Sequence, residues 1–262
     1  MKELIERFAN SEKVNSFAKE LLLPNRNFAT GCINKTKDRV HLFLFADKQR
    51  AVYFYNDLEL FFDTTDTPQE DKDIVFYPAS YTHQDDVSSI QNANVVLRNM
   101  ALQKLISHKA RVIVSYPQAV SEKVVASRTL HSKMISVRTG DTLDIDEFID
   151  KLDDYGFERV SQVYDAGQFS LRGGIIDVYS FASQQPFRIE VFGDQVDSIR
   201  TFDIASQLSI EIKDQITILA DNSSTQTLTE KVALTDYLPQ DTIIWVEERK
   251  RCTAEFASAE QL

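Results

Sequence analysis

Glycine is scarce in this sequence, and its placement excludes two nucleotide-binding motifs. The 262 residues include seven glycines, at positions 31, 140, 156, 167, 173, 174 and 193. A phosphate-binding P-loop needs two glycines five residues apart, with lysine after the second, because its backbone amides wrap around a phosphate. No two of these glycines are five apart, none precedes a lysine, and none begins the G-x-G-x-x-G pattern of dinucleotide-binding folds.

Cysteine and long apolar runs are also lacking. The two cysteines, Cys32 and Cys252, are too few for a disulfide framework, and no histidine or cysteine has a partner at metal-ligand spacing. No stretch approaches the roughly 20 apolar residues of a membrane helix. Residues 1–7 include acids in place of the apolar core of a signal peptide. We therefore expect a cytoplasmic monomer with free thiols, no metal and no membrane partner.

Positive charge is in deficit. The chain has 29 Lys and Arg against 40 Asp and Glu, a net charge of −11. Nucleic-acid binding draws much of its affinity from neutralising phosphates, so autonomous binding of DNA or RNA is disfavoured unless a local basic patch survives. The 43% hydrophobic and 26% charged residues are typical of an ordinary globular protein and exclude a disordered chain.

The first 133 residues alternate between helical and strand patterns. Apolar residues recur at helical spacing over 4–22, 47–61 and 95–106. Short, almost wholly apolar runs follow or precede them at 40–46, 74–77 and 111–116, which is typical of strands that are covered on both faces. This alternation predicts an α/β domain with a parallel, helix-covered sheet.

Residues 134–220 show a different pattern, and residues 221–262 return to the first one. One acidic helix is expected over 145–155, where Gly156 ends it. Five short strands are then predicted without intervening helices, at 160–164, 169–172, 175–179, 187–192 and 196–202, which favours an α+β domain with an antiparallel sheet. After a polar linker at 221–227, a helix is expected over 228–238 and a strand over 242–246. The chain stops within a helical pattern, so we expect it to be part of a longer protein.

Candidates for catalysis are poor. Asp85 and Asp86 are adjacent carboxylates, but their polar surroundings favour a solvated loop. No serine lies in the G-x-S-x-G pattern of a nucleophile elbow, and neither cysteine has a neighbour that would lower its pKa. We expect no catalytic residue and no cofactor in these 262 residues.

The strand at 187–192 carries the most informative pattern. Alternation places Phe187, Ile189 and Val191 on one face, the natural core face, and Arg188 and Phe192 on the other. In the same way, Arg172 lies opposite the apolar side of its strand. An aromatic residue flanked by arginines is typical of a protein-interface anchor, here for a partner that presents carboxylates.

An alternative reading of the same strand remains open. Phe192 would then pack under a neighbouring helix, and both arginines would make local ion pairs. The interface reading requires that all three side chains cluster on one exposed face. It also implies that replacing any of them leaves the domain folded.

Residues 155–203 resemble a known family. The segments that carry the resemblance are YGFERV at 155–160, RGGIIDV at 172–178 and RIEVFGDQVDSIRTFD at 188–203. They are similar to the N-terminal, UvrB-like module of transcription-repair coupling factors, with weaker similarity at 98–105, 112–114 and 236–239. The resemblance implies a degenerate P-loop-NTPase-like domain at 1–133 (like UvrB domain 1a), an inserted UvrA-binding domain at 134–220 (domain 2) and the start of a 1b-like domain at 221–262.

The resemblance also implies a function. Family members are ATP-dependent DNA translocases that clear stalled RNA polymerase from damaged DNA and recruit UvrA for nucleotide excision repair. Their ATP-driven motor, which acts on duplex DNA, and their polymerase-binding domains follow the region present here. This chain would therefore be a non-catalytic module that binds UvrA, and the family's UvrA-contacting residues correspond to Arg172, Arg188 and Phe192.

Two features separate this sequence from UvrB itself. The stretch that corresponds to the UvrB P-loop, residues 28–36, lacks the second glycine and the Gly-Lys pair, so we expect residues 28–37 to form an ordinary strand-to-helix connection. The path from Pro78 to Arg98 spans 21 residues with Tyr81 as its one aromatic, too short for UvrB's tyrosine-rich DNA hairpin. The alternative, a helicase-like fragment with weak nucleotide or DNA binding, is disfavoured by both.

The first prediction concerns nucleotide binding. Because no glycine-rich loop can wrap a phosphate, MgATP at millimolar concentration should not raise the melting temperature of this chain, whereas it should raise that of UvrB. A thermal-shift titration tests this. Saturable binding of ATP with a dissociation constant below roughly 1 mM would contradict the prediction.

Overall fold

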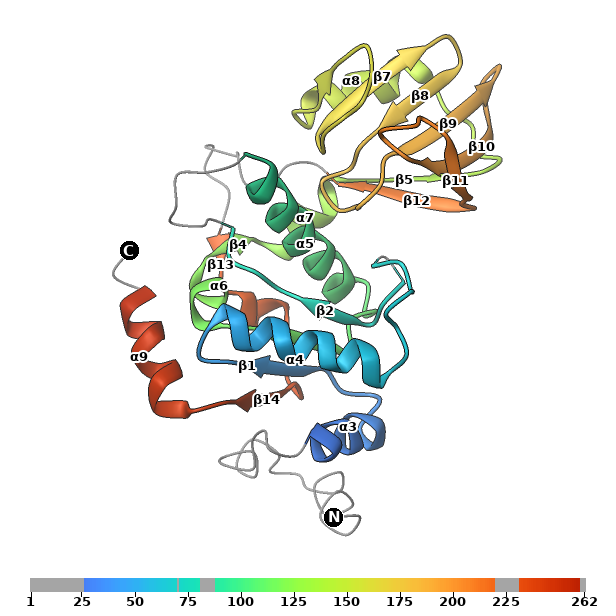
Figure 1. Ribbon diagram of the computed structural model, residues 1–262. Coiled ribbons are helices and arrows are strands. Elements are labelled where there is room, and N and C mark those ends of the chain that lie inside the picture. The colour runs from blue at the N-terminus through green and yellow to red at the C-terminus, as the bar shows by residue number, and fades with distance from the viewer. Residues whose placement is uncertain (1–25, 70, 81–87, 220–230, 260–262) are drawn as a thin grey trace. The chain divides into compact units, whose positions relative to one another are not determined.

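The computed structural model describes residues 26–69, 71–80, 88–219 and 231–259, which fold as two compact units (Figure 1). Unit 1 takes the described parts of 1–86, 101–124 and 231–262, and unit 2 those of 87–100 and 125–230. The helical pattern at 4–22, the pair Asp85–Asp86 and the linker at 221–227 lie outside the described residues. Within the described ranges, no helix is long and apolar enough to cross a membrane.

Unit 1 is built on a parallel sheet. Its four strands, in the spatial order β14-β1-β3-β2, are β14 (Ile243–Val246), β1 (His41–Leu44), β3 (Val112–Ser115) and β2 (Ile74–Phe76). Every residue of β1 and β3 is buried, as expected for strands covered on both faces. The sequence prediction of a parallel α/β sheet is therefore confirmed.

Helices account for much of the remaining described chain. Helix α4 (Lys48–Phe61) packs on β2 and β3, and its N-cap residue Asp47 accepts a hydrogen bond of 3.0 Å from the Arg50 amide. Helix α6 (Pro117–Ser121) packs against α9 (Arg249–Ala259). The others are α3 (Arg26–Lys35), α5 (Ser88–Ile106), α7 (Ser127–Ser132) and α8 (Ile145–Asp154).

Three sequence expectations are wrong. Residues 28–35 belong to helix α3, not to a strand-to-helix connection, because burial of Cys32 and Ile33 stabilises a helical turn there. The described part of 228–238 is strand β13 (Lys231–Val232), paired with β4 (Val124–Val125), and the 3₁₀ helix η1 (Leu234–Tyr237), which Pro239 follows. Residues 160–164 are not a strand. The strand of that region is β6 (Glu158–Arg159), which ends immediately before them.

A buried hydrogen-bond chain links α3, β1 and β14. Trp245 donates from Nε1 to Nδ1 of His41 (3.0 Å), so the imidazole proton lies on Nε2, which is 2.9 Å from Oγ1 of Thr36. Thr36 in turn donates to the carbonyl of Cys32 (2.7 Å). Burial lowers the pKa of His41 to about 4, so the ring is neutral at physiological pH, and both of its nitrogens are hydrogen-bonded.

Unit 2 is built on a six-stranded sheet. In spatial order its strands are β11 (Ser209–Ile212), β10 (Gln195–Phe202), β9 (Phe187–Phe192), β8 (Ile175–Val178), β7 (Gln168–Arg172) and β6, antiparallel except for the parallel pair β6–β7. Strands β5 (Met134–Arg138) and β12 (Gln215–Leu219) form a separate antiparallel ribbon. The sequence predicted the strands from β7 to β10 but not β5, β11 or β12.

One face of this sheet forms the core of unit 2. Phe148, Ile149 and Leu152 of α8 pack into a cluster with apolar residues of β7 to β10, β5 and β12. Helix α8 forms where the sequence predicts it. Asp144 caps its first turn by accepting from the Glu147 amide (3.1 Å), and Gly156, with a φ of 81°, follows its end.

Two hairpins turn at the same end of the sheet. The turn Gly173-Gly174 joins β7 to β8, and Gly193-Asp194 joins β9 to β10. In each, the first residue has a positive φ, 62° at Gly173 and 66° at Gly193, which favours glycine. Gly174 has a different requirement, because a Cβ there would lie 2.4 Å from the carbonyl oxygen of Val191, and the Gly174 oxygen accepts from the Val191 amide (2.8 Å).

The second prediction compares the two hairpins. Gly174→Ala should lower the free energy of unfolding by about 1–3 kcal/mol, because its methyl group collides with backbone and lifts the β7–β8 hairpin from β9. Asp194→Ala, at the equivalent turn position, is the matched control and should change stability by about 0.5 kcal/mol or less. Chemical denaturation measures both. Equal stabilities for the two variants would contradict the close approach.

Candidate functional site

The face of the six-stranded sheet that lies opposite the unit 2 core is here called the outer face. Strand pairing places Ser170, Asp177, Arg188, Arg200 and Ile212 in one row across five strands of this face. On the core face, Phe187 and Ile189 are buried and Val191 is packed against the cluster, as the alternation predicts. The outer face therefore carries the charged residues that the sequence analysis selected.

Arg172 and Phe192 occupy equivalent positions in the two hairpins. Each is the last strand residue before its turn, so both lie at the same end of the sheet. Strand pairing aligns Arg172, through Ile175 of β8, with Glu190 of β9, so Phe192 lies two strands away from Arg172 and two residues beyond that row, next to its turn. The side chain of Phe192 is 85% exposed. The alternative that Phe192 packs under a neighbouring helix is therefore wrong.

Asp177 joins the two arginines of the site. Its carboxylate, on a residue only 1% exposed, accepts two hydrogen bonds from Arg188, from Nε to Oδ1 (2.7 Å) and from Nη2 to Oδ2 (3.0 Å). Arg172 donates from Nη2 to the same Oδ2 atom. Both arginines thus make local ion pairs, as the alternative reading proposed, while Phe192 stays exposed.

Arg188 is held from several sides. Its Nη1 donates to the carbonyl oxygen of Gln207 (3.2 Å), and its guanidinium lies 4.4 Å from the ring centroid of the buried Phe202. The hydrogen bond to Asp177 raises the pKa of Arg188 above its usual value. The side chain is 16% exposed, against 46% for Arg172. The three predicted residues share one face, but Arg188 is not exposed as the sequence analysis required.

The electrostatic consequence is a net positive charge on the three side chains Arg172, Asp177 and Arg188. One carboxylate pairs with two guanidinium groups, which leaves a net charge of +1 in this cluster. Among the described residues, Arg172 has no hydrogen-bond partner other than Asp177. The next pair on the same face, Glu190 and Arg200 (2.9 Å), is neutral overall. An exposed phenylalanine near an available guanidinium can anchor a partner that offers an apolar pocket and a carboxylate.

Sequence reasoning missed Asp177, and a signal for it was present. In the strand Ile175–Val178, Ile176 and Val178 point to the core, so alternation places Asp177 on the outer face. The cross-strand partners could not be read from the sequence, because they depend on the register that pairs Asp177 with Arg188.

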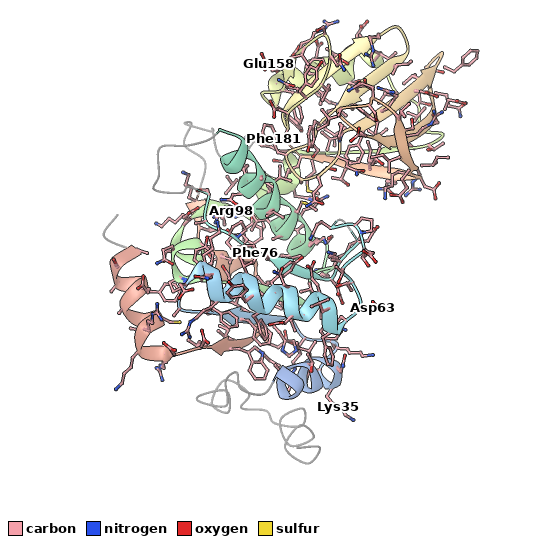
Figure 2. The ribbon with its side chains drawn as sticks, viewed as in Figure 1. Lys35, Asp63, Phe76, Arg98, Glu158 and Phe181 are labelled. Carbon is pink, nitrogen blue, oxygen red and sulfur yellow. The ribbon has the colours of Figure 1, made fainter. Side chains whose placement is uncertain are left out.

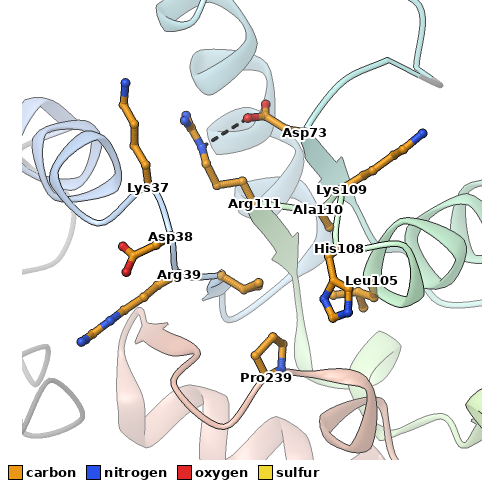
Figure 3. Close-up of a pocket in the computed structure, with 11 residues that line it drawn as sticks. Lys37, Asp38, Arg39, Asp73, Leu105, His108, Lys109, Ala110, Arg111 and Pro239 are labelled. Atoms are coloured by element: carbon orange, nitrogen blue, oxygen red, sulfur yellow. Dashed lines mark ion pairs between the residues drawn. The ribbon is translucent and has the colours of Figure 1, made fainter.

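Unit 1 contains a cavity of about 300 Å³, but its side chains do not converge on a ligand (Figure 3). It lies where β1, β2 and β3 begin, whereas ligands of open α/β sheets bind outside the carboxyl ends of the strands. Lys37, Arg39 and Lys109 point in different directions in Figure 3, and Arg111 pairs with Asp73 (3.3 Å). This arrangement does not form a phosphate cradle.

Other chemical sites are equally weak in the described part of the chain. Lys35, from the stretch that corresponds to a P-loop, is exposed at the end of α3 (Figure 2). No group of three or more His, Cys, Asp or Glu in this part could hold a metal ion. Burial raises the pKa of the Cys32 thiol to about 12 and that of Cys252 to about 11, so neither is a ready nucleophile.

Comparisons with known proteins point to the same region. Residues 135–223 match the family model described as the UvrB interaction domain. The chain is similar to proteins named transcription-repair-coupling factor, with 30% identity over 149 residues in Bacillus subtilis and 27% over 173 residues in Escherichia coli. These matches cover 57% and 66% of this chain but 13% and 14% of the relatives. The Staphylococcus haemolyticus protein is 48% identical over 84 residues, which are 32% of this chain and 7% of that protein.

The third prediction separates the roles of Arg188 and Phe192 in stability. Arg188→Ala should lower the free energy of unfolding by about 3 kcal/mol, because it leaves the buried Asp177 carboxylate with one partner. This revises the expectation that no site residue matters for folding. Phe192→Ala, at an 85% exposed position, should cost about 0.5 kcal/mol or less. Urea denaturation of both variants tests the difference, and a small loss for Arg188→Ala would refute it.

Proposed function

We propose that the chain is a non-catalytic module that binds UvrA, because residues 135–223 match the UvrB interaction domain and the chain is similar to transcription-repair-coupling factors. The binding surface is the hairpin end of the outer face, with Arg172 and Phe192 as direct contacts and Arg188 beside them. The observation that carries the proposal is the 85% exposure of Phe192 at the same end of the outer face as Arg172, whose guanidinium has Asp177 as its one carboxylate partner among the described residues.

The physical character of this surface supports a protein partner. Binding energy at protein interfaces concentrates in a few aromatic and arginine residues near the centre of the contact. The exposed Phe192 contributes little to the folding of unit 2. Its burial in a partner would remove apolar area from water, which favours binding. The chain's net charge of −11 disfavours nucleic acid as the ligand of this face.

The wider role follows from the relatives. We propose that UvrA recruitment by this module couples the removal of stalled RNA polymerase to nucleotide excision repair. The chain spans 13% and 14% of the length of the Bacillus and Escherichia relatives. ATP hydrolysis and contacts with RNA polymerase and duplex DNA are accordingly assigned to parts of such proteins outside these 262 residues, and the described residues need no cofactor for this role.

The fourth prediction tests the surface directly. Phe192→Ala should weaken binding of purified UvrA at least about 30-fold, which corresponds to about 2 kcal/mol for a hot-spot aromatic. Arg172→Glu should weaken it by as much or more, because a like charge then faces the partner's carboxylate. Isothermal titration calorimetry measures both, with melting temperatures as a check that the variants are folded.

Tyr164→Ala is the matched control for this experiment. Tyr164 is also an exposed aromatic of unit 2, at 54%, but it lies in the loop before β7, away from the hairpin turns. Its variant should bind UvrA as the unmodified chain does. Unchanged affinity for both Phe192→Ala and Arg172→Glu would rule out this surface.

A further inference from the structure

We infer that Asp177 is a positioning residue of the interaction site, which fixes the Arg172 guanidinium for the partner before binding. The inference rests on the proposed function, because it names the group that organises the same surface. Asp177 does not itself reach the partner, since it is 1% exposed beneath the two arginines.

The division of hydrogen bonds at Asp177 is the first argument. Arg188 binds the carboxylate in a bidentate manner, with one hydrogen bond to each oxygen. Arg172 adds a single hydrogen bond to Oδ2. Arg188 therefore supplies the charge that compensates Asp177. Arg172 is tethered by one of its five donors and keeps its positive charge for a carboxylate of the partner.

Preorganisation is the second argument. A free arginine side chain samples many rotamers, and fixing it at the moment of binding reduces affinity. Arg172 is 46% exposed and lies at the end of a strand, where little packing would otherwise restrict it. The bond to Asp177 orders this side chain in the free protein, so the partner meets an arginine already in place.

The cost of a buried carboxylate is the third argument. Replacement of a buried ion pair by apolar residues is often neutral or stabilising, so stability does not require Asp177 at this position. Ile176 and Val178, its neighbours in β8, already supply the apolar residues of the core face. A charged residue on the outer face is better explained by what it orients, namely the Arg172 guanidinium, with Arg188 compensating its charge.

A double-mutant cycle tests the inference. Asp177→Asn keeps the shape of the side chain but removes its charge, and it should weaken UvrA binding about fivefold to tenfold when Arg172 is present. In an Arg172→Ala background, Asp177→Asn should cause no further loss of affinity, because the residue that it positions is gone. Glu190→Gln, which removes a carboxylate paired with Arg200 on the same face, is the matched control and should change affinity less than twofold.

The outcomes separate a positioning role from a structural one. A merely structural Asp177 would lower affinity equally in both backgrounds, and that result would overturn the inference. Tighter binding by Asp177→Asn would also overturn it, because Asp177 would then compete with the partner for Arg172. If Asp177→Asn does not fold, Asp177→Glu, which shifts the carboxylate by one methylene group, enters the same cycle with the same expectation.

A measurement without UvrA distinguishes failure of this inference from failure of the proposed function. Arginine side-chain NMR of the free chain should show slow rotation of the Arg172 guanidinium, and fast rotation in Asp177→Asn. Equally fast rotation in both proteins overturns the inference whatever the partner is. Slow rotation that is lost in Asp177→Asn, in a chain that does not bind UvrA, supports the positioning role and refutes the proposed function.

Discussion

The carboxylate of Asp177, shared by two guanidinium groups, is the interaction on which the outer face of unit 2 depends. It is buried, so it must be paired, and the strand register brings Arg188 directly opposite it to satisfy both oxygens. The loop residue Gln207 and the ring of Phe202 hold Arg188 from the other side. With Arg188 committed to this interior role, Arg172 carries the charge that remains available at the surface.

The two hairpin turns determine where Arg172 and Phe192 lie on the outer face. Gly174 lets the β7–β8 turn approach the backbone of Val191, which fixes the position of Arg172 relative to β9. Gly193 turns the chain immediately after Phe192 and leaves that ring exposed. The core face, packed on α8, provides the rigid support. Unit 1 contributes a parallel sheet whose cavity lies at the amino ends of its strands, the opposite edge from that used by nucleotide-binding sheets.

Much of the fold and of the candidate site could be predicted from the sequence, wherever apolar residues recur with the period of a strand or helix. Apolar runs revealed β1 and β3, and alternation in β9 correctly separated Phe187 and Ile189 from Arg188 and Phe192. The edge strand β11 was missed because its alternation, Ser-Ile-Glu-Ile, runs over only four residues, and that alternation does not correspond to burial, since all four residues are exposed. The interior role of Arg188 was missed because it depends on Asp177 and Gln207, which only strand pairing and a loop bring to it.

The central claim is that the hairpin end of the outer face contacts UvrA, and cross-linking from that point tests it most directly. A photoreactive benzoylphenylalanine at position 192 should cross-link to purified UvrA on illumination, because that side chain is 85% exposed and would enter the interface. The same group at position 164 should give no cross-link. Absence of a cross-link from position 192, or equal yields from both positions, would contradict the account.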